Sequence, residues 1–295
     1  MDLTDLFFIS LGTAVALYYG VKLLLFSRML FPKLWFPLSE SFFTSMGEWA
    51  VVTGASEGIG RAYAFVLAEQ GMNVVIMSRT KVTLDQVAKE ISDTTGRRVK
   101  VIVVDFIEEN VFSEIEDELK DLNIGVLVNN VGTLPSLIPC RFLEIPELDQ
   151  VCMCKIVLPG MDNRRKGVIV NISSGAASIP FPLYTLYAAS KVFVERFSQG
   201  LQAEYKDKGI IIQAVAPFGV STRMTAYQPT NMVTPSPEDF VKFSQQYLRA
   251  GDKTNGSVSH TLLGLLLQTI PPKLLYAESM LRSVQDYVKR KAAKK

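Results

Sequence analysis

The sequence predicts an α/β fold, a doubly wound parallel sheet with helices on both faces, preceded by an N-terminal membrane helix. Three observations predict it. Short runs rich in β-branched residues alternate with helix-like segments along most of the 295 residues, and such alternation is typical of parallel sheets. A glycine-rich turn joins the first of these runs to a helix. An uncharged apolar stretch lies near the N-terminus.

The apolar stretch is long enough to cross a bilayer. Residues 6–21 carry no charge and the apolar run resumes after Lys22, while about 20 apolar residues span a hydrocarbon core. Arg28 and Lys33 follow the stretch, and basic residues prefer the cytosolic side, so we expect a lumenal N-terminus and a cytosolic main domain. A cleaved signal peptide fits less well, because the preceding residues are acidic and no small-x-small site follows closely. A hydrophobic hairpin or an interfacial helix stays open.

A glycine-rich motif follows the first expected strand at 49–53. Residues 53–60 have the pattern Thr-Gly-x-x-x-Gly-x-Gly, and the helix after them is ended by Gly71 before a second strand at 73–77. In such a βαβ unit the turn lets backbone N–H groups approach a pyrophosphate at the helix N-terminus. The motif therefore predicts a dinucleotide site, and a glycine turn with no further role is the alternative.

The residue after the second strand indicates which dinucleotide binds. Arg79 lies nineteen residues after Gly60. An acidic residue there accepts hydrogen bonds from the ribose hydroxyls of NAD, whereas an arginine pairs with the 2′-phosphate of NADP(H). We therefore expect NADP(H), with a solvated surface arginine as the alternative.

A tyrosine and a lysine at helical spacing predict acid–base chemistry. Tyr187 and Lys191 are four residues apart, and Ser174 lies thirteen residues before the tyrosine. Residues four apart lie on one helix face, and an ammonium beside a phenol lowers the tyrosine pKa. A phenol tuned in this way can exchange a proton with a carbonyl or alcohol oxygen. The spacing alone also occurs on ordinary solvated helix faces.

The remaining elements continue the alternation. Further strands are expected at 99–104, 124–129, 167–172 and 210–215, with helices at 83–94, 111–122 and 187–206. Residues 219–240 are rich in Pro, Thr and Ser, so we expect a substrate lid or an irregular surface loop there. The leucine-rich segments 262–267 and 274–281 are expected in the core, with a substrate wall or a second membrane contact as alternatives.

Composition excludes several other functions. A formal charge of only +2 gives no reason to expect nucleic-acid binding. Cys140, Cys152 and Cys154 are too few for a zinc site with the lone His260, so we expect reduced structural thiols, a structural histidine and no metal. The basic segment 289–295 is expected to be a solvated tail that touches anionic lipid.

Taken in order, the glycine motif, Asn129-Asn130-Val131-Gly132, Ser174 and Tyr187-x-x-x-Lys191 resemble the short-chain dehydrogenase/reductase family, which has a Rossmann-type fold, over roughly residues 47–280. Residues 47–54, 124–132 and 171–175 are similar to the membrane-bound 17β-hydroxysteroid dehydrogenases, and 133–139 looks like their type 3 branch, which reduces androstenedione to testosterone. The resemblance implies NADPH-dependent reduction of a 17-ketosteroid at the endoplasmic reticulum membrane. Reduction of 3-ketoacyl-CoA, the activity of the type 12 branch, is the alternative.

The resemblance also implies roles for single residues. Tyr187 would donate a proton, Ser174 would bind the substrate carbonyl, and Lys191 would bind the nicotinamide ribose. Asp105 would bind the adenine amine, and Asn130 the adenosine ribose or the neighbouring backbone. Phe218 stands where the family usually has glycine. The expected cofactor-binding set is Gly54, Ser56, Gly58, Ile59, Gly60, Arg79, Asp105, Asn130, Tyr187, Lys191, Val220 and Thr222.

One segment departs from the family pattern. Roughly eleven residues, about three helical turns, are missing between Cys154 and Lys155, including the asparagine that completes the family's proton relay. Asn163 lies beyond a Pro159-Gly160 pair that is expected to break the helix. An impaired enzyme or a non-catalytic NADP-binding scaffold is therefore an alternative, and the homodimer that this helix often forms in the family is in doubt.

The sequence divides the chain into three expected parts. Residues 1–45 form a membrane anchor and linker, residues 46–280 an NADP-binding catalytic domain, and residues 281–295 the basic tail. The expected partners are a lipophilic ketone and the membrane.

Overall fold

The computed structural model describes residues 2–108, 111–132, 149–182 and 184–275, with a few isolated residues after 275. Cys140, the stretch 133–139 and most of the tail at 281–295 lie outside the described residues.

A seven-stranded parallel sheet forms the centre of the main domain. Its order is β3-β2-β1-β4-β5-β6-β7, so the direction of winding reverses between β1 and β4. A ligand site is expected at that point, beyond the carboxyl ends of the strands. Six strands agree with the prediction, and the two-residue β7 was missed. The strands are β1 (Trp49–Thr53), β2 (Asn73–Ser78), β3 (Val99–Val103), β4 (Ile124–Asn129), β5 (Gly167–Ile172), β6 (Ile210–Val215) and β7 (Lys253–Thr254).

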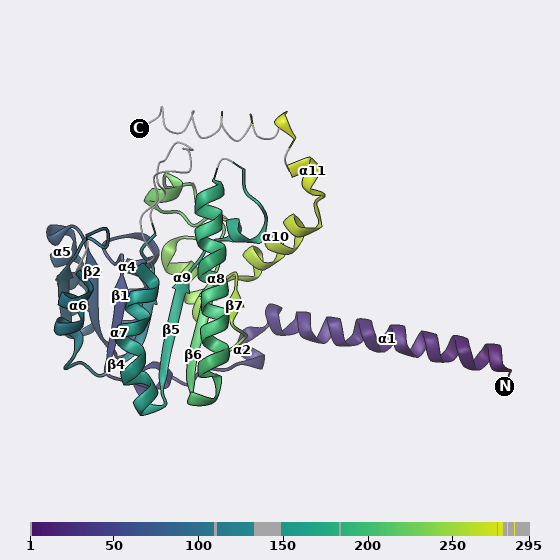
Figure 1. Cartoon of the computed structure of the whole chain (residues 1–295), viewed down its shortest axis with the longest axis horizontal. Coiled ribbons are helices and arrows are strands. Elements are labelled where there is room, and N and C mark those ends of the chain that lie inside the picture. The colour runs from purple at the N-terminus through teal and green to yellow at the C-terminus, as the bar shows by residue number, and fades with distance from the viewer. Residues whose placement is uncertain are drawn as a thin grey trace.

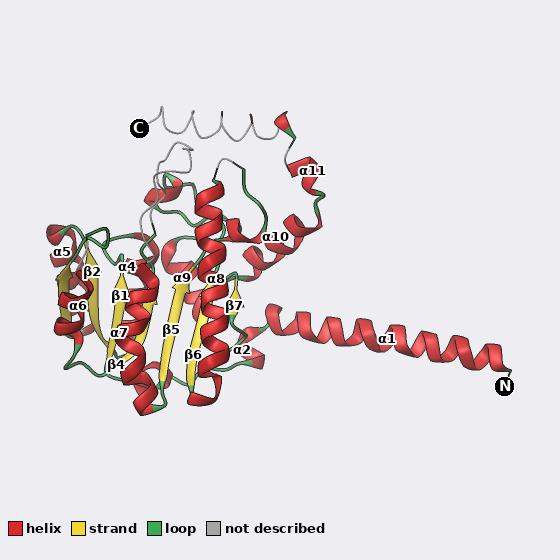
Figure 2. Ribbon diagram, in the orientation of Figure 1, coloured by secondary structure: helices red, strands yellow, loops and turns green. Residues whose placement is uncertain are grey.

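Helices cover both faces of this sheet (Figures 1 and 2). Residues of α4, α5 and α9 share one apolar core with Ala50 and Val52, whereas residues of α6, α7 and α8 share the other with Trp49 and Val51. Alternate residues of a strand point to opposite faces, so β1 is buried on both sides. The helices are α1 (Leu3–Leu30), α2 (Pro32–Trp35), α3 (Phe42–Met46), α4 (Gly58–Glu69), α5 (Lys81–Thr95), α6 (Val111–Leu119), α7 (Asp149–Arg164), α8 (Thr185–Tyr205), α9 (Pro237–Gln245), α10 (Val258–Thr269) and α11 (Pro272–Leu275), with short 3₁₀ turns η1 (Gly175–Ser178), η2 (Lys206–Lys208) and η3 (Arg223–Thr225).

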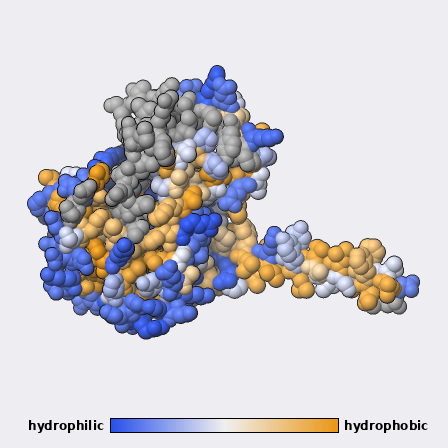
Figure 3. Space-filling view, viewed as in Figure 1, coloured by the Kyte–Doolittle hydropathy of each residue, from blue (hydrophilic) through white to orange (hydrophobic). Residues whose placement is uncertain are grey.

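The helix α1 projects from the main domain as a long apolar rod (Figures 1 and 3). None of its 28 residues is buried, and its length and apolar composition suffice to cross a membrane. At 1.5 Å per residue it is about 42 Å long, more than the roughly 30 Å of a hydrocarbon core. A hydrogen bond from the Tyr247 hydroxyl to the Met29 carbonyl (2.9 Å) joins its base to the domain. The helix agrees with the predicted membrane segment in position and length.

The helix α7 continues through Pro159 and Gly160, so the predicted break there is wrong. Met153, Val157 and Met161 are buried against the sheet. Each such side chain contributes about 1.5–3 kcal/mol on burial, which offsets the roughly 3 kcal/mol cost of a proline inside a helix. The segment Asp149–Arg164 is therefore a continuous crossover helix.

The leucines of α10 correct a second expectation. Leu262, Leu265 and Leu266 are exposed, and so is Leu274 in α11, although core packing was the expectation for them. The core side of α10 is formed instead by His260, Thr261 and Gly264.

Candidate active site

The glycine motif forms a tight turn at the N-terminus of α4. Gly54 and Gly58 have φ values of +64° and +59°, a region that favours glycine. A Cβ on Gly60 would lie 2.6 Å from the Asn130 amide nitrogen, too close for any side chain. The backbone is therefore free of side chains where a pyrophosphate would approach the helix N-terminus, and the residues present fit a dinucleotide.

Asn130 ties the end of β4 to this turn. Its Nδ2 donates to the carbonyls of Thr53 and Gly54, both at 3.2 Å. The Thr53 hydroxyl accepts from the N–H groups of Asn130 (3.0 Å) and Val131 (3.2 Å). Of the two predicted roles of Asn130, contact with the neighbouring backbone is the one seen here, and contact with the ribose stays a prediction.

A polar cavity of about 350 Å³ lies beside the glycine turn. Arg79 and Arg223 both line it, together with hydroxyl groups. Two guanidinium groups and several hydroxyls are the donor set that binds a phosphate monoester. The lining residues are Ser56, Glu57, Ser78, Arg79, Thr80, Thr83 and Arg223.

The arginines of the cavity have carboxylate neighbours. Arg223 Nε lies 2.8 Å from Glu57 Oε1, and Arg79 Nη1 lies 3.9 Å from Asp105 Oδ2. The Asp105 carboxylate also accepts from the Ile107 N–H at 3.2 Å. Sequence analysis missed Arg223, because only the fold brings η3 to the end of β2.

The three predicted catalytic residues come together beyond β5. Ser174 precedes η1, and its Oγ accepts from the Ala176 N–H at 3.2 Å. Tyr187 and Lys191 share one face of α8, with Lys191 Nζ 5.8 Å from the centre of the Tyr187 ring. Lys191 Nζ also donates to the Ile172 carbonyl at 3.0 Å. The site can thus offer a phenol, a hydroxyl and an ammonium to one small group.

Burial has the largest effect on the pKa values of Tyr187 and Lys191. It raises the pKa of Tyr187, and a hydrogen bond with Ser174 opposes this only in part. Burial lowers the pKa of Lys191 to about 8. The predicted net lowering of the Tyr187 pKa is therefore wrong, because the net shift is upward. Tyr187 is fully protonated at neutral pH, as a proton donor must be.

The buried Lys191 predicts a pH-dependent stability. Its pKa is about 8 in the folded chain, against an ordinary lysine value of 10.5. Between these pH values the unfolded chain binds more protons than the folded one, so the free energy of unfolding rises with pH. We expect Lys191→Met to be more stable than the parent by about 3 kcal/mol near neutral pH and by almost nothing near pH 10.5, measured by urea unfolding.

The matched control for this experiment is Lys81→Met, since the Lys81 side chain is 71% exposed. It should leave the pH dependence of the parent unchanged. A stability difference for Lys191→Met that does not vary with pH would contradict the assignment.

The segment after β6, residues 216–222, covers the glycine turn. Val220 is buried, and Thr222 Cγ2 lies 3.2 Å from the position of a Cβ on Gly58, so this segment lies over the glycine turn. The Phe218 N–H donates to His260 Nδ1 at 3.3 Å, and His260 Nε2 lies 2.9 Å from the Val233 carbonyl. Burial lowers the His260 pKa, which agrees with a structural role. Among the described residues no cluster could hold a metal ion.

Sequence comparison identifies the family. A family model described as short chain dehydrogenase matches residues 48–232. The chain belongs to this family. This chain is 54% identical to a 17-beta-hydroxysteroid dehydrogenase type 3 of Danio rerio over 304 aligned residues, which cover 99% of each chain. It is 39% identical over 280 residues, 90% of this chain and 88% of the other, to a human very-long-chain 3-oxoacyl-CoA reductase.

A solved structure agrees with the fold. The short-chain dehydrogenase of Sphingobium yanoikuyae in complex with NADPH superposes with a TM-score of 0.64 at 27% identity, covering 76% of this chain and 96% of that one. The predicted doubly wound fold and family are confirmed.

The alignment also bears on the missing segment of this dehydrogenase. Its 304 positions with the Danio rerio protein are nine more than the 295 residues of this chain, so at least nine residues of the relative have no counterpart here. Asn163 does not replace the relay asparagine. It lines a groove of about 510 Å³ between α7 and α8 together with Tyr205, which lies about four turns along α8 from Lys191.

A buried amide network stands where α7 approaches the strand ends. Asn129 Nδ2 donates to Asn171 Oδ1 at 2.9 Å, and Asn171 Nδ2 donates to Ser198 Oγ at 2.9 Å. The Cys154 thiol lies 3.5 Å from Asn129 Nδ2, and burial raises its pKa to about 12. Cys154 is therefore a packing residue and not a nucleophile.

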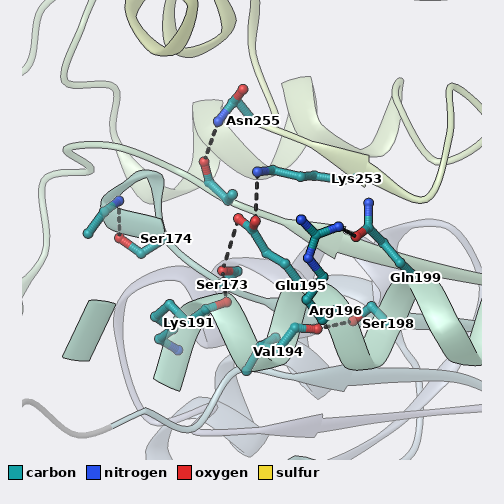
Figure 4. Close-up of polar contacts among 12 residues, drawn as sticks. Ser173, Ser174, Lys191, Val194, Glu195, Arg196, Ser198, Gln199, Lys253 and Asn255 are labelled. Atoms are coloured by element: carbon teal, nitrogen blue, oxygen red, sulfur yellow. Dashed lines mark hydrogen bonds and ion pairs between the residues drawn. The ribbon is translucent and has the colours of Figure 1, made fainter. Parts of the chain in front are cut away.

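A second network of polar contacts holds α8 in place (Figure 4). The Ser173 hydroxyl donates to the Lys191 carbonyl at 2.9 Å and lies 3.4 Å from Glu195 Oε1. The buried Glu195 pairs with Lys253 Nζ at 2.6 Å. These contacts join α8 to the ends of β5 and β7. Sequence analysis missed the Glu195–Lys253 pair, because β7 was not predicted.

Proposed function

We propose that this chain reduces a 17-ketosteroid of the androstenedione type to the 17β-alcohol, with NADPH as the hydride donor. The observation that carries the proposal is the convergence of Ser174, Tyr187 and Lys191 at one end of the sheet, beside a cavity with two arginines. The similarity to type 3 17-beta-hydroxysteroid dehydrogenases over nearly the whole chain supports the steroid.

Ser174, Tyr187 and Lys191 each have a separate role in the proposed reduction. When bound, the reduced nicotinamide supplies a hydride to the carbonyl carbon. Ser174 donates a hydrogen bond to the carbonyl oxygen and stabilises the negative charge that develops there. The Tyr187 phenol gives its proton to that oxygen, so the product is a neutral alcohol. Lys191 binds the nicotinamide ribose and stabilises the resulting phenolate.

The glycine turn and the arginine cavity are proposed to hold the rest of the cofactor. Gly54, Gly58 and Gly60 leave the backbone open to the pyrophosphate, with Ser56 and Ile59 between them. Arg79 and Arg223 bind the 2′-phosphate, while Asp105 binds the adenine. The segment with Val220 and Thr222 covers the nicotinamide amide.

Loss of a cavity arginine is expected to remove the preference for NADPH. One charged hydrogen-bonded contact contributes about 1.5–3 kcal/mol, so Arg79→Met and Arg223→Met should each weaken NADPH binding about 10–100-fold and leave NADH binding nearly unchanged. Fluorescence titration with both cofactors measures this. Lys81→Met, a charge change just outside the cavity, is the control. Equal losses for NADPH and NADH would contradict the 2′-phosphate assignment.

A second candidate substrate is a 3-ketoacyl-CoA, which the 3-oxoacyl-CoA reductase relatives favour. Membranes containing this chain are assayed with NADPH and either androstenedione or a 3-ketoacyl-CoA. Turnover of the acyl-CoA alone would replace the steroid with the elongation substrate. NADPH binding without turnover of either would identify a non-catalytic NADP-binding scaffold.

The chain is proposed to be anchored in a membrane and to form a homodimer. We infer that residues 1–45 anchor the protein in the endoplasmic reticulum membrane, that residues 46–280 form the catalytic domain on the cytosolic side, and that 281–295 is a tail. We further propose that a homodimer forms through α7 and α8, where Leu158, Phe197 and Leu201 line a groove.

A further inference from the structure

The outer face of α10 is an uncharged apolar strip. The helix contains no charged residue. Val258, Leu262, Leu265 and Leu266 are 36–60% exposed, and their spacing of four, three and one places them on one side of the helix. A surface helix normally turns polar residues outward, so this strip has the character of a face that contacts an apolar phase.

The inner face of the same helix borders the candidate active site. A Cβ on Gly264 would lie 3.3 Å from Phe218 Cε2, and a Cβ on Gly175 would lie 2.6 Å from Phe218 Cγ. Gly175 follows Ser174 directly. The helix α10 is thus the wall between the catalytic serine and the apolar strip.

The C-terminal end of α1 indicates that the outer face of α10 lies at the membrane surface. α10 contacts α1, and both α10 and α11 lie on the side of the domain from which α1 leaves (Figure 1). Phe26, Ser27 and Arg28 are half-buried, whereas Leu25 and the residues before it are exposed. A helix about 12 Å longer than the hydrocarbon core brings its last turns, and therefore α10, to the headgroup layer.

We propose that the apolar strip of α10, made of Val258, Leu262, Leu265 and Leu266, lies in the interface of the bilayer beside α1. Arg28 lies in α1, which contacts α10, and Lys273 lies in α11, which follows α10 in the chain; both cations suit anionic headgroups. The membrane contact stands independently of the proposed reaction. The second part of the inference rests on the proposed function: a ketone dissolved in the membrane reaches Ser174 from the side of the domain that α10 covers, without passing through water.

Fluorescence quenching tests the contact without any need for turnover. The full-length chain carries Leu266→Trp in a Trp35→Phe background and is reconstituted in anionic phospholipid vesicles with or without brominated acyl chains. Val82→Trp in the same background is the control, because Val82 is 68% exposed on α5, far from α1 (Figure 1). Brominated lipid should reduce the emission at position 266 and leave the control unchanged.

Equal emission in both lipids for Leu266→Trp would overturn the contact. Leu262→Trp, on the same strip, repeats the test if the first variant fails to fold. The buried Trp49 is common to all samples and contributes a constant background.

Placing charges on the apolar strip tests whether the ketone reaches the site from the membrane. The double variant Leu262→Glu/Leu266→Glu should raise the apparent KM for a steroid supplied in vesicles and leave the affinity for NADPH unchanged. An unchanged KM would overturn the route. A parent chain without steroid turnover would instead overturn the proposed function, and the quenching result would still decide the membrane contact.

Discussion

Replacing Tyr187 with phenylalanine is expected to lower kcat for steroid reduction by about 10²–10⁴-fold, the usual contribution of a positioned proton donor. Phenylalanine keeps the ring beside Lys191, 5.8 Å from Nζ in the parent, and removes only the hydroxyl that carries the proton. The affinity for NADPH should therefore stay within a few-fold of the parent. Initial rates with NADPH and androstenedione, together with a cofactor titration, measure both quantities.

Tyr184→Phe is the matched control. Tyr184 immediately precedes α8 and is partly exposed, so the variant makes the same chemical change three residues from Tyr187. Its turnover should resemble that of the parent. A Tyr187→Phe variant with unchanged turnover would refute the proton-donor role, even if NADPH still binds.

Restoring the missing part of the crossover helix is expected to have the second large effect. The insertion places the family's segment, with the asparagine that the family resemblance implies, between Cys154 and Lys155. If the asparagine supplies one hydrogen bond to the charged relay behind Lys191, the gain is about 1.5–3 kcal/mol, or about 10–100-fold in kcat. Steady-state rates of the parent and the inserted chain, with equal cofactor occupancy, measure the gain.

The same insertion with alanine in place of the asparagine separates chemistry from helix length. It restores the turns of α7 without the amide, so it should retain the stability of the inserted chain and lose most of the gain in kcat. Equal rates for the two insertions would show that helix length, and not the asparagine, limits this chain. Equal rates for the parent and both insertions would show that the chain is competent as it stands.

The strands and the glycine turn could be predicted from the sequence because their signals are local. Runs such as residues 99–103 are β-branched except for Lys100, and glycine is the residue favoured at the positive φ of Gly54 and Gly58. Tyr187 and Lys191 were predictable for the same reason, since four residues of helix fix their relation. The family resemblance added the Rossmann-type fold of the short-chain dehydrogenases.

What the sequence did not predict depends on contacts between distant segments. Arg223 joins Arg79 across 144 positions of the chain, and no local pattern marks it. The shift of the Tyr187 pKa was predicted with the wrong sign because helical spacing says nothing of burial, which has the largest effect on this pKa. The continuation of α7 through Pro159 was missed because buried side chains, which propensity ignores, stabilise the helix there.

The hydrogen bond between Tyr247 and Met29 has a consequence for the order of folding. It joins residues 218 positions apart, whereas the helix α1 is complete after the first thirty residues have been made. During synthesis the proposed membrane helix α1 is made long before Tyr247, which lies between α9 and β7, so their contact can form only after most of the chain exists. Long-range parallel pairings such as β1 with β4 form late. The angle between the anchor and the domain is therefore among the last features of the native state to be fixed.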